Sequence, residues 1–171
     1  VANEQGVPLE YEMDGKPLAM FFADLQEAKA ELAKAQEEFP DLNCDLIPVG
    51  LGTAYKLSCQ GKASLFPNTA ELRAAGAADG ASFRELPLFA CMEMSQDSAT
   101  GAPMLPLFQS WQDCSAQVRQ VFPANDQPDI AMMPLSSVVE RLASVSVGES
   151  VAFRFIPASA SAKYIADYLG L

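Results

Sequence analysis

The residues of this sequence that could do chemistry are its four cysteines, Cys44, Cys59, Cys91 and Cys114. None of them stands in a C-x-x-C pair, so their spacing matches neither a zinc ribbon nor a dithiol redox centre. The chain has no histidine, which removes the commonest general base and metal ligand along with Ser-His and Cys-His nucleophile pairs. Most hydrolase mechanisms are thereby excluded, and the sequence predicts no catalytic residue, no metal and no cofactor.

The cysteines allow three pairings into two disulfides, or they pack as buried free thiols. Cys44 and Cys59 are the candidate disulfide that is closest in sequence, because both lie at the ends of adjacent predicted strands. A thiol oxidoreductase that uses Cys91 and Cys114 is an alternative. We disfavour it because Cys114 falls on the apolar side of a predicted helix, where burial raises the pKa of a thiol. We therefore expect a protein that is not an enzyme.

Composition narrows the classes of partner. The chain has 11 basic and 22 acidic residues, which gives a formal net charge of −11. This charge repels phosphate backbones and anionic lipid surfaces, so nucleic acid is excluded as a partner. No stretch approaches the roughly 20 apolar residues that span a bilayer. We expect a soluble protein that does not insert into a membrane.

Two stretches, 15–28 and 101–114, share one plan. Residues of the same type recur at one constant separation: Gly15 and Gly101, Pro17 and Pro103, Phe22 and Phe108, Gln26 and Gln112, and further on Pro48 and Pro134. In each stretch a glycine-containing turn leads into an apolar run and then into a polar N-cap, Asp24 or Ser110, with an acidic residue three positions later. This order predicts a strand followed by a helix, and the self-similarity predicts two copies of one unit.

The predicted fold is α+β, with the order β-β-α-β-α-β-β-α in each copy and pseudo-twofold symmetry between the copies. The copies span 7–76 and 84–171 and together form one domain. In the first copy we expect strands at 7–13, 16–22, 45–49, 55–59 and 63–66, a helix at 24–39, a turn or short helix at 50–54, and a helix from Asn68 to Gly76, with Glu71 serving its first turn. In the second copy we expect strands at 86–94, 104–108, 129–133, 144–147 and 151–156, and helices at 110–122, 137–143 and 157–169.

Aromatic and apolar residues of these strands are the candidates for a protein-binding surface with apolar grooves. The candidates are Phe21, Phe22, Met104, Leu107, Phe108, Trp111, Phe153 and Phe155, with Met132 and Met133 beside them. The alternative is that they form the core, as such residues usually do. For Trp111 we expect the core, because it directly follows the Ser110 cap and its ring can reach back over the strand at 104–108.

The sequence resembles the family of the twenty-two-kilodalton component of the Tic translocon. The motif Gly-x-Pro-(apolar)-x-x-(apolar)-Phe-(three residues)-Gln carries the resemblance in both copies, together with Ile47-Pro-Val-Gly-Leu-Gly-Thr-Ala-Tyr-Lys-Leu57 and Phe153-Arg-Phe-Ile-Pro157. The resemblance implies a soluble plastid or cyanobacterial factor of protein import at the inner-envelope translocon. It further implies a duplicated α+β fold whose apolar grooves bind translocating or client polypeptides in a chaperone-like way, in the intermembrane space or the thylakoid lumen.

A second function is compatible with the same fold. The protein could be an accessory subunit docked on a membrane complex, such as a photosystem with its light-harvesting antenna in an algal plastid. The apolar surface would then meet one permanent partner, and the acidic remainder would face water. Co-purification with pigment-protein complexes through a gradient would distinguish this role from client binding.

Overall fold

A computed structural model describes the chain apart from residues 14, 75, 77–85, 98–102, 125–128 and 145–151. It is a mixed α+β structure that divides into two compact units. Unit 1 comprises Val1–Asn68 and Ala160–Leu171, and unit 2 comprises Thr69–Ser159. These units are defined by packing, whereas the predicted copies at 7–76 and 84–171 follow the sequence, and that division stays a prediction.

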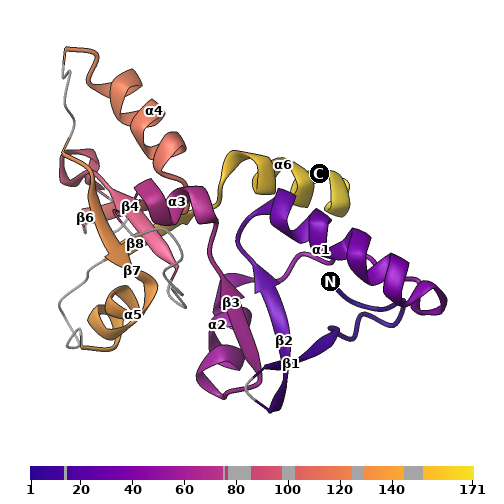
Figure 1. Ribbon diagram of the computed structural model, residues 1–171. Helices are drawn as coiled ribbons and strands as arrows, with labels where there is room; N and C mark the ends of the chain where they lie inside the picture. The colour runs from indigo at the N-terminus through magenta and orange to yellow at the C-terminus, as the bar shows by residue number, and fades with distance from the viewer. Residues whose placement is uncertain (14, 75, 77–85, 98–102, 125–128, 145–151) are drawn as a thin grey trace. The chain divides into compact units, whose positions relative to one another are not determined.

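The sheet of unit 1 contains β1 (Glu10–Met13), β2 (Lys16–Phe22) and β3 (Ala63–Phe66), paired in that order (Figure 1). β1 runs antiparallel to β2, and β2 pairs in parallel with β3. The parallel register aligns Phe22 with Phe66, and their rings stack with centroids 5.3 Å apart. The strand predicted at 16–22 is confirmed.

The first helix, α1 (Leu25–Glu38), begins where its predicted cap places it. The carboxylate of Asp24 accepts hydrogen bonds from the backbone N–H groups of Gln26 and Glu27, each 2.9 Å long. These bonds satisfy two donors that a helix start otherwise leaves unpaired. The helix ends before a short 3-10 helix, η1 (Pro40–Leu42), which starts at the predicted proline stop.

The element order predicted for the first half is wrong between 45 and 59. Residues 55–59 belong to a helix, α2 (Leu51–Cys59), and within 45–49 the structure shows an isolated bridge between Asp45 and Ala2. Leu51, Ala54 and Tyr55 recur at helical spacing, and α2 packs against β3 with Ala54 buried. The first half therefore reads β1, β2, α1, α2, β3 and then a third helix, α3 (Thr69–Ala74).

Within the described residues, the sheet of unit 2 contains five strands: β4 (Pro87–Ala90), β5 (Gln96–Asp97), β6 (Pro103–Phe108), β7 (Ala131–Pro134) and β8 (Ala152–Ile156). β6 pairs in parallel with β8 and antiparallel with β4 and β5. β4 pairs on its other side with β7, also antiparallel. Among the strands that the structure describes, β7 has β4 as its one neighbour and therefore lies at an edge of the sheet.

Unit 2 buries its apolar core between this sheet and the helix α4 (Trp111–Val121). Phe89 of β4 and Phe108 of β6 are aligned across the sheet, so their side chains share one face. Cys114 and Val118, one helical turn apart on α4, pack against that face and are fully buried. Ser110 caps α4 as predicted, since its hydroxyl accepts a hydrogen bond from the Asp113 N–H.

Two helices of the second half follow the prediction with shifted bounds: α5 (Leu135–Ser144) and the C-terminal helix α6 (Ser159–Leu169). The strand predicted at 86–94 is shorter in the structure, since β4 ends at Ala90 and a 3-10 helix, η2 (Met92–Met94), follows it. Most of the strand predicted at 144–147 lies outside the described residues.

The two segments that share a sequence plan also share structural details. Phe22 and Phe108 are the last residues of β2 and β6, and the next residue in each case donates its N–H to the neighbouring parallel strand, at 2.9 Å for Ala23 and 3.0 Å for Gln109. Pro17 and Pro103 lie in the two strands, and Gln26 and Gln112 are the second residues of α1 and α4. Gly101 lies outside the described residues. These residues thus occupy similar places in two strand–helix segments, whereas Pro48 lies outside any helix or strand and Pro134 is the last residue of β7.

Candidate functional site

The predicted protein-binding residues are divided between the two units. Phe21 and Phe22 belong to unit 1 and are half-buried, and the other six belong to unit 2. Leu107 and Phe108 are 0% and 4% exposed, which leaves them no surface for a partner. Met104 and Phe153 are half-buried, whereas Phe155 is exposed.

The strand register also places the unit 2 candidates on opposite faces of the sheet. Leu107 is aligned with Phe155, and Phe108 with Ile156, between the parallel strands β6 and β8. Aligned residues share a face and successive residues alternate, so Phe108 faces α4 while Leu107 and Phe155 face the other side. A continuous groove lined by all of them is therefore not present.

Trp111 lies at the first position of α4, and the expectation that it belongs to the core is wrong. Its side chain is 37% exposed and is not part of the buried cluster under α4. Its backbone N–H donates a hydrogen bond of 2.6 Å to the carboxylate of Glu71 on α3. The backbone of this residue is thus fixed, while part of its ring is available to solvent.

The four cysteines are free thiols in the structure. Cys44 is buried and Cys59 is exposed at the end of α2. The argument for a disulfide between them rested on adjacent strands, and α2 removes that argument. The pairing itself stays a prediction.

The thiols of Cys91 and Cys114 share the buried cluster of unit 2, among phenylalanine, methionine and valine side chains. Burial raises the pKa of Cys114 to about 11, and the nearby Cys91 adds to the shift. A catalytic thiol needs the opposite shift, because the thiolate is the nucleophile. This environment argues against the oxidoreductase alternative.

When an aromatic disulfide reagent is added to the folded protein at pH 8, we expect only the thiol of Cys59 to react rapidly. With a pKa of about 11, roughly a thousandth of the Cys114 thiol is ionised at that pH, and burial blocks the reagent as well. The release of chromophore with time measures this difference, and Cys59→Ser should remove the fast phase. A fast phase that persists in Cys59→Ser would contradict the described packing.

Within the described residues, no group of three or more cysteine, aspartate or glutamate side chains is placed to hold a metal ion. Likewise, no helix in the described part of the chain is long and apolar enough to cross a membrane.

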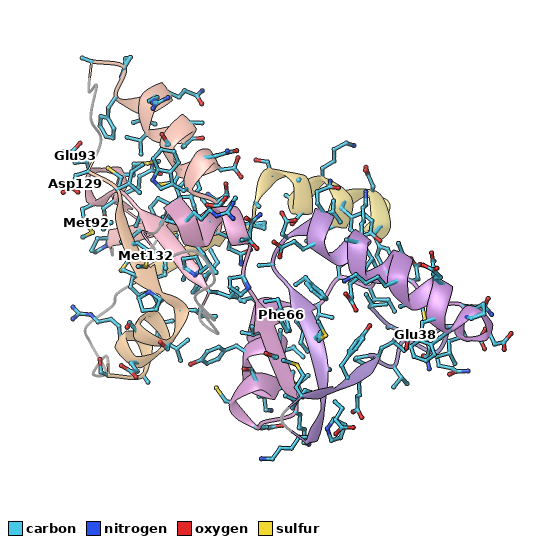
Figure 2. All side chains as sticks on the ribbon, viewed as in Figure 1. Glu38, Phe66, Met92, Glu93, Asp129 and Met132 are labelled. Carbon is cyan, nitrogen blue, oxygen red and sulfur yellow. The ribbon has the colours of Figure 1, made fainter. Side chains whose placement is uncertain are left out.

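Exposed methionines gather at the β7 side of unit 2. Met92 and Met132 are 66% and 41% exposed, and Glu93 and Asp129 beside them are also exposed. The antiparallel pairing of β4 with β7 brings the chain before β7 next to the chain after β4, and Figure 2 shows all four residues at one margin of the unit. We call Met92, Glu93, Asp129 and Met132 the methionine edge. It combines unbranched, adaptable apolar side chains with negative charge.

The hydrogen-bonding pattern of β7 follows from its register with β4. The register pairs Pro87 with Pro134, Leu88 with Met133, Phe89 with Met132 and Ala90 with Ala131. Antiparallel pairs alternate between hydrogen-bonded and non-hydrogen-bonded, and prolines cannot exchange both bonds, so the pair of Pro87 with Pro134 is non-bonded. In the next pair along the ladder, the Leu135 N–H donates a hydrogen bond of 2.9 Å to the Leu86 carbonyl, which agrees with this alternation. Met132, two residues from Pro134, therefore directs its N–H and C=O away from β4.

From the sequence, Met132 was only a secondary candidate, and Met92, Glu93 and Asp129 were not candidates at all. The local signal was Met-Glu-Met at 92–94, where methionine alternates with charge, and Met-Met at 132–133, which begins three residues after Asp129. The exposure of Met132 depends on β7 being an edge strand. The edge position is a property of how the strands pair and not of either sequence segment alone.

No protein-family model matches the sequence, and no curated protein is similar to it in sequence. Two solved structures are similar over nearly the whole chain. Anabaena Tic22, described as a protein of protein transport, matches with a TM-score of 0.68 at 22% identity, over 97% of this chain and 89% of that one. Tic22 from Plasmodium falciparum matches with a TM-score of 0.71 at 17% identity, over 99% of this chain and 92% of that one. The resemblance seen in the sequence is thus confirmed in three dimensions, and the chain has the Tic22 fold.

Proposed function

We propose that this protein is a non-enzymatic polypeptide-binding factor of protein import, with a chaperone-like action on unfolded segments. The observation that carries the proposal is the fold shared with the Anabaena protein of protein transport over almost the full length of both chains. The absence of histidine and the buried, weakly acidic Cys114 thiol favour binding over catalysis.

The methionine edge is the surface we assign to clients. Methionine has three rotatable bonds and a polarisable sulfur, so Met92 and Met132 can adapt to different apolar side chains. Glu93 and Asp129, on a chain with a net charge of −11, favour segments that carry lysine or arginine. The occupant is therefore an unfolded segment that is both apolar and basic.

The proposed location is a plastid, in the intermembrane space or the thylakoid lumen, with translocating polypeptides or the translocon as partners. The accessory role on a photosystem or antenna complex uses the same fold with one permanent partner. Adaptable methionines at an edge support changing clients over a permanent partner, for which a fixed complementary surface suffices.

The duplication predicted from the sequence is also part of the proposal. We infer that the two halves are copies of one ancestral unit related by pseudo-twofold symmetry. The support is the matching position of Pro17, Phe22 and Gln26 with Pro103, Phe108 and Gln112 in the two strand–helix segments. A rigid-body superposition of these segments in an experimental structure tests it.

Fluorescence anisotropy tests the proposed function with two labelled, unfolded synthetic peptides, one of leucine and arginine and one in which glutamate replaces arginine. We expect the protein to bind the basic peptide more tightly, and salt to weaken that binding. The double variant Met92→Ser, Met132→Ser should bind at least about tenfold more weakly, on the usual scale of interface anchors. Val49→Ser, at a residue of unit 1 that is 42% exposed, is the matched control and should bind like the parent.

Two results would overturn the proposal. One is the absence of binding to either peptide. The other is that the protein binds no free peptide but co-sediments with pigment-protein complexes through a density gradient. That result would establish the accessory role instead.

A further inference from the structure

We propose that β7 receives its clients by strand addition, so that an extended client segment becomes an additional strand at the edge of the unit 2 sheet. This inference rests on the proposed function and specifies how the methionine edge works. Strand addition supplies affinity through main-chain hydrogen bonds, which do not depend on the client's sequence. It therefore suits a factor that meets many different polypeptides.

The backbone of β7 is arranged for this role. Met132 directs its N–H and C=O to the side of β7 that faces away from β4, as the register with Pro87 and Pro134 requires. The structure describes no strand on that side, and Met132 is 41% exposed. One donor and one acceptor thus stand next to each other at the edge, in the arrangement that a pairing strand uses.

The residues around β7 limit which client segment can pair with this strand and at which of its residues. Pro134 ends the strand and offers no N–H, so it restricts pairing to the segment around Met132. Glu93 and Asp129 are exposed close to the N-terminal end of β7, where they favour a client with a basic residue at that end of the paired segment. The client chemistry is an extended stretch of alternating apolar and basic residues.

Two substitutions of Met132 separate the contribution of its backbone to client binding from that of its side chain. Met132→Ala removes the methionine but keeps the outward N–H, whereas Met132→Pro removes both. Because this N–H points away from β4, proline removes no hydrogen bond of the ladder, and an edge strand tolerates it. We expect Met132→Pro to bind the basic peptide about threefold to tenfold more weakly than Met132→Ala, the effect of one hydrogen bond. Circular dichroism and the melting temperature verify that both variants are folded.

A second measurement leaves the protein unchanged. The same basic peptide is made with N-methyl groups on its central residues, which preserve its side chains but remove its main-chain donors. Strand addition predicts at least about tenfold weaker binding of the methylated peptide.

The outcomes distinguish this inference from the function on which it rests. If the parent protein binds the basic peptide but binds its methylated form equally well, strand addition is wrong and contact through side chains stands. Equal affinity of folded Met132→Pro and Met132→Ala would overturn it in the same way. If the parent binds neither peptide, the proposed function fails as well.

Discussion

Phe89→Ala is expected to lower the free energy of unfolding by about 3–5 kcal/mol, the usual cost of removing a buried phenylalanine. Phe89 is 1% exposed and lies between Phe108 of the neighbouring strand and the α4 residues Cys114 and Val118. Its removal leaves a cavity that this cluster can fill only in part. Denaturant unfolding followed by circular dichroism measures the change through the shift of the transition midpoint.

Phe155→Ala is the matched control for this prediction. It removes the same side chain from a strand of the same sheet, at a residue that is 37% exposed. We expect a cost below about 1.5 kcal/mol, since part of that ring already contacts water. Equal costs for the two variants would show that α4 does not cover the Phe89 face as described.

Glu71→Ala is expected to destabilise the protein by about 2 kcal/mol. The carboxylate of Glu71 is buried and accepts the Trp111 N–H at 2.6 Å, at the positive end of α4. Its loss leaves a helix-start donor without this acceptor and removes a negative charge that stabilises the helix dipole. Thermal unfolding measures the effect.

Glu71→Gln separates the two contributions. It keeps an oxygen acceptor of nearly the same shape but removes the charge, so we expect about half the loss that alanine causes. If alanine and glutamine both leave stability unchanged, the contact between α3 and α4 contributes nothing to the fold.

The elements that the sequence predicted best are those specified by neighbouring residues. α1 and α4 begin where Asp24 and Ser110 provide an N-cap, and α1 stops at Pro40, as cap and stop signals require. These signals act over one or two helical turns, so they are present in the sequence itself. The resemblance to the Tic family extended the prediction from these local elements to the fold of the whole chain.

The predictions that failed depend on contacts between distant segments. Residues 55–59 alternate like a strand, but packing against β3 selects a helix for them. The hydrogen bond that Glu71 accepts from Trp111, 40 positions away, was not predicted from the sequence. The exposure of Met132 follows from the place of β7 at the sheet edge, which no local pattern encodes.

The central claim, that clients bind at the methionine edge, is tested most directly by amide hydrogen exchange of Met132 and Met133 in the parent protein. Leu88 and Met133 form a bonded pair, so the Met133 N–H points towards β4 and should exchange slowly with or without client. The Met132 N–H points outward and should exchange fast in the free protein. We predict that the basic peptide slows the exchange of Met132 by at least about tenfold and leaves Met133 nearly unchanged. Tight binding of the peptide with unaltered exchange at Met132 and new protection in unit 1 would contradict the claim.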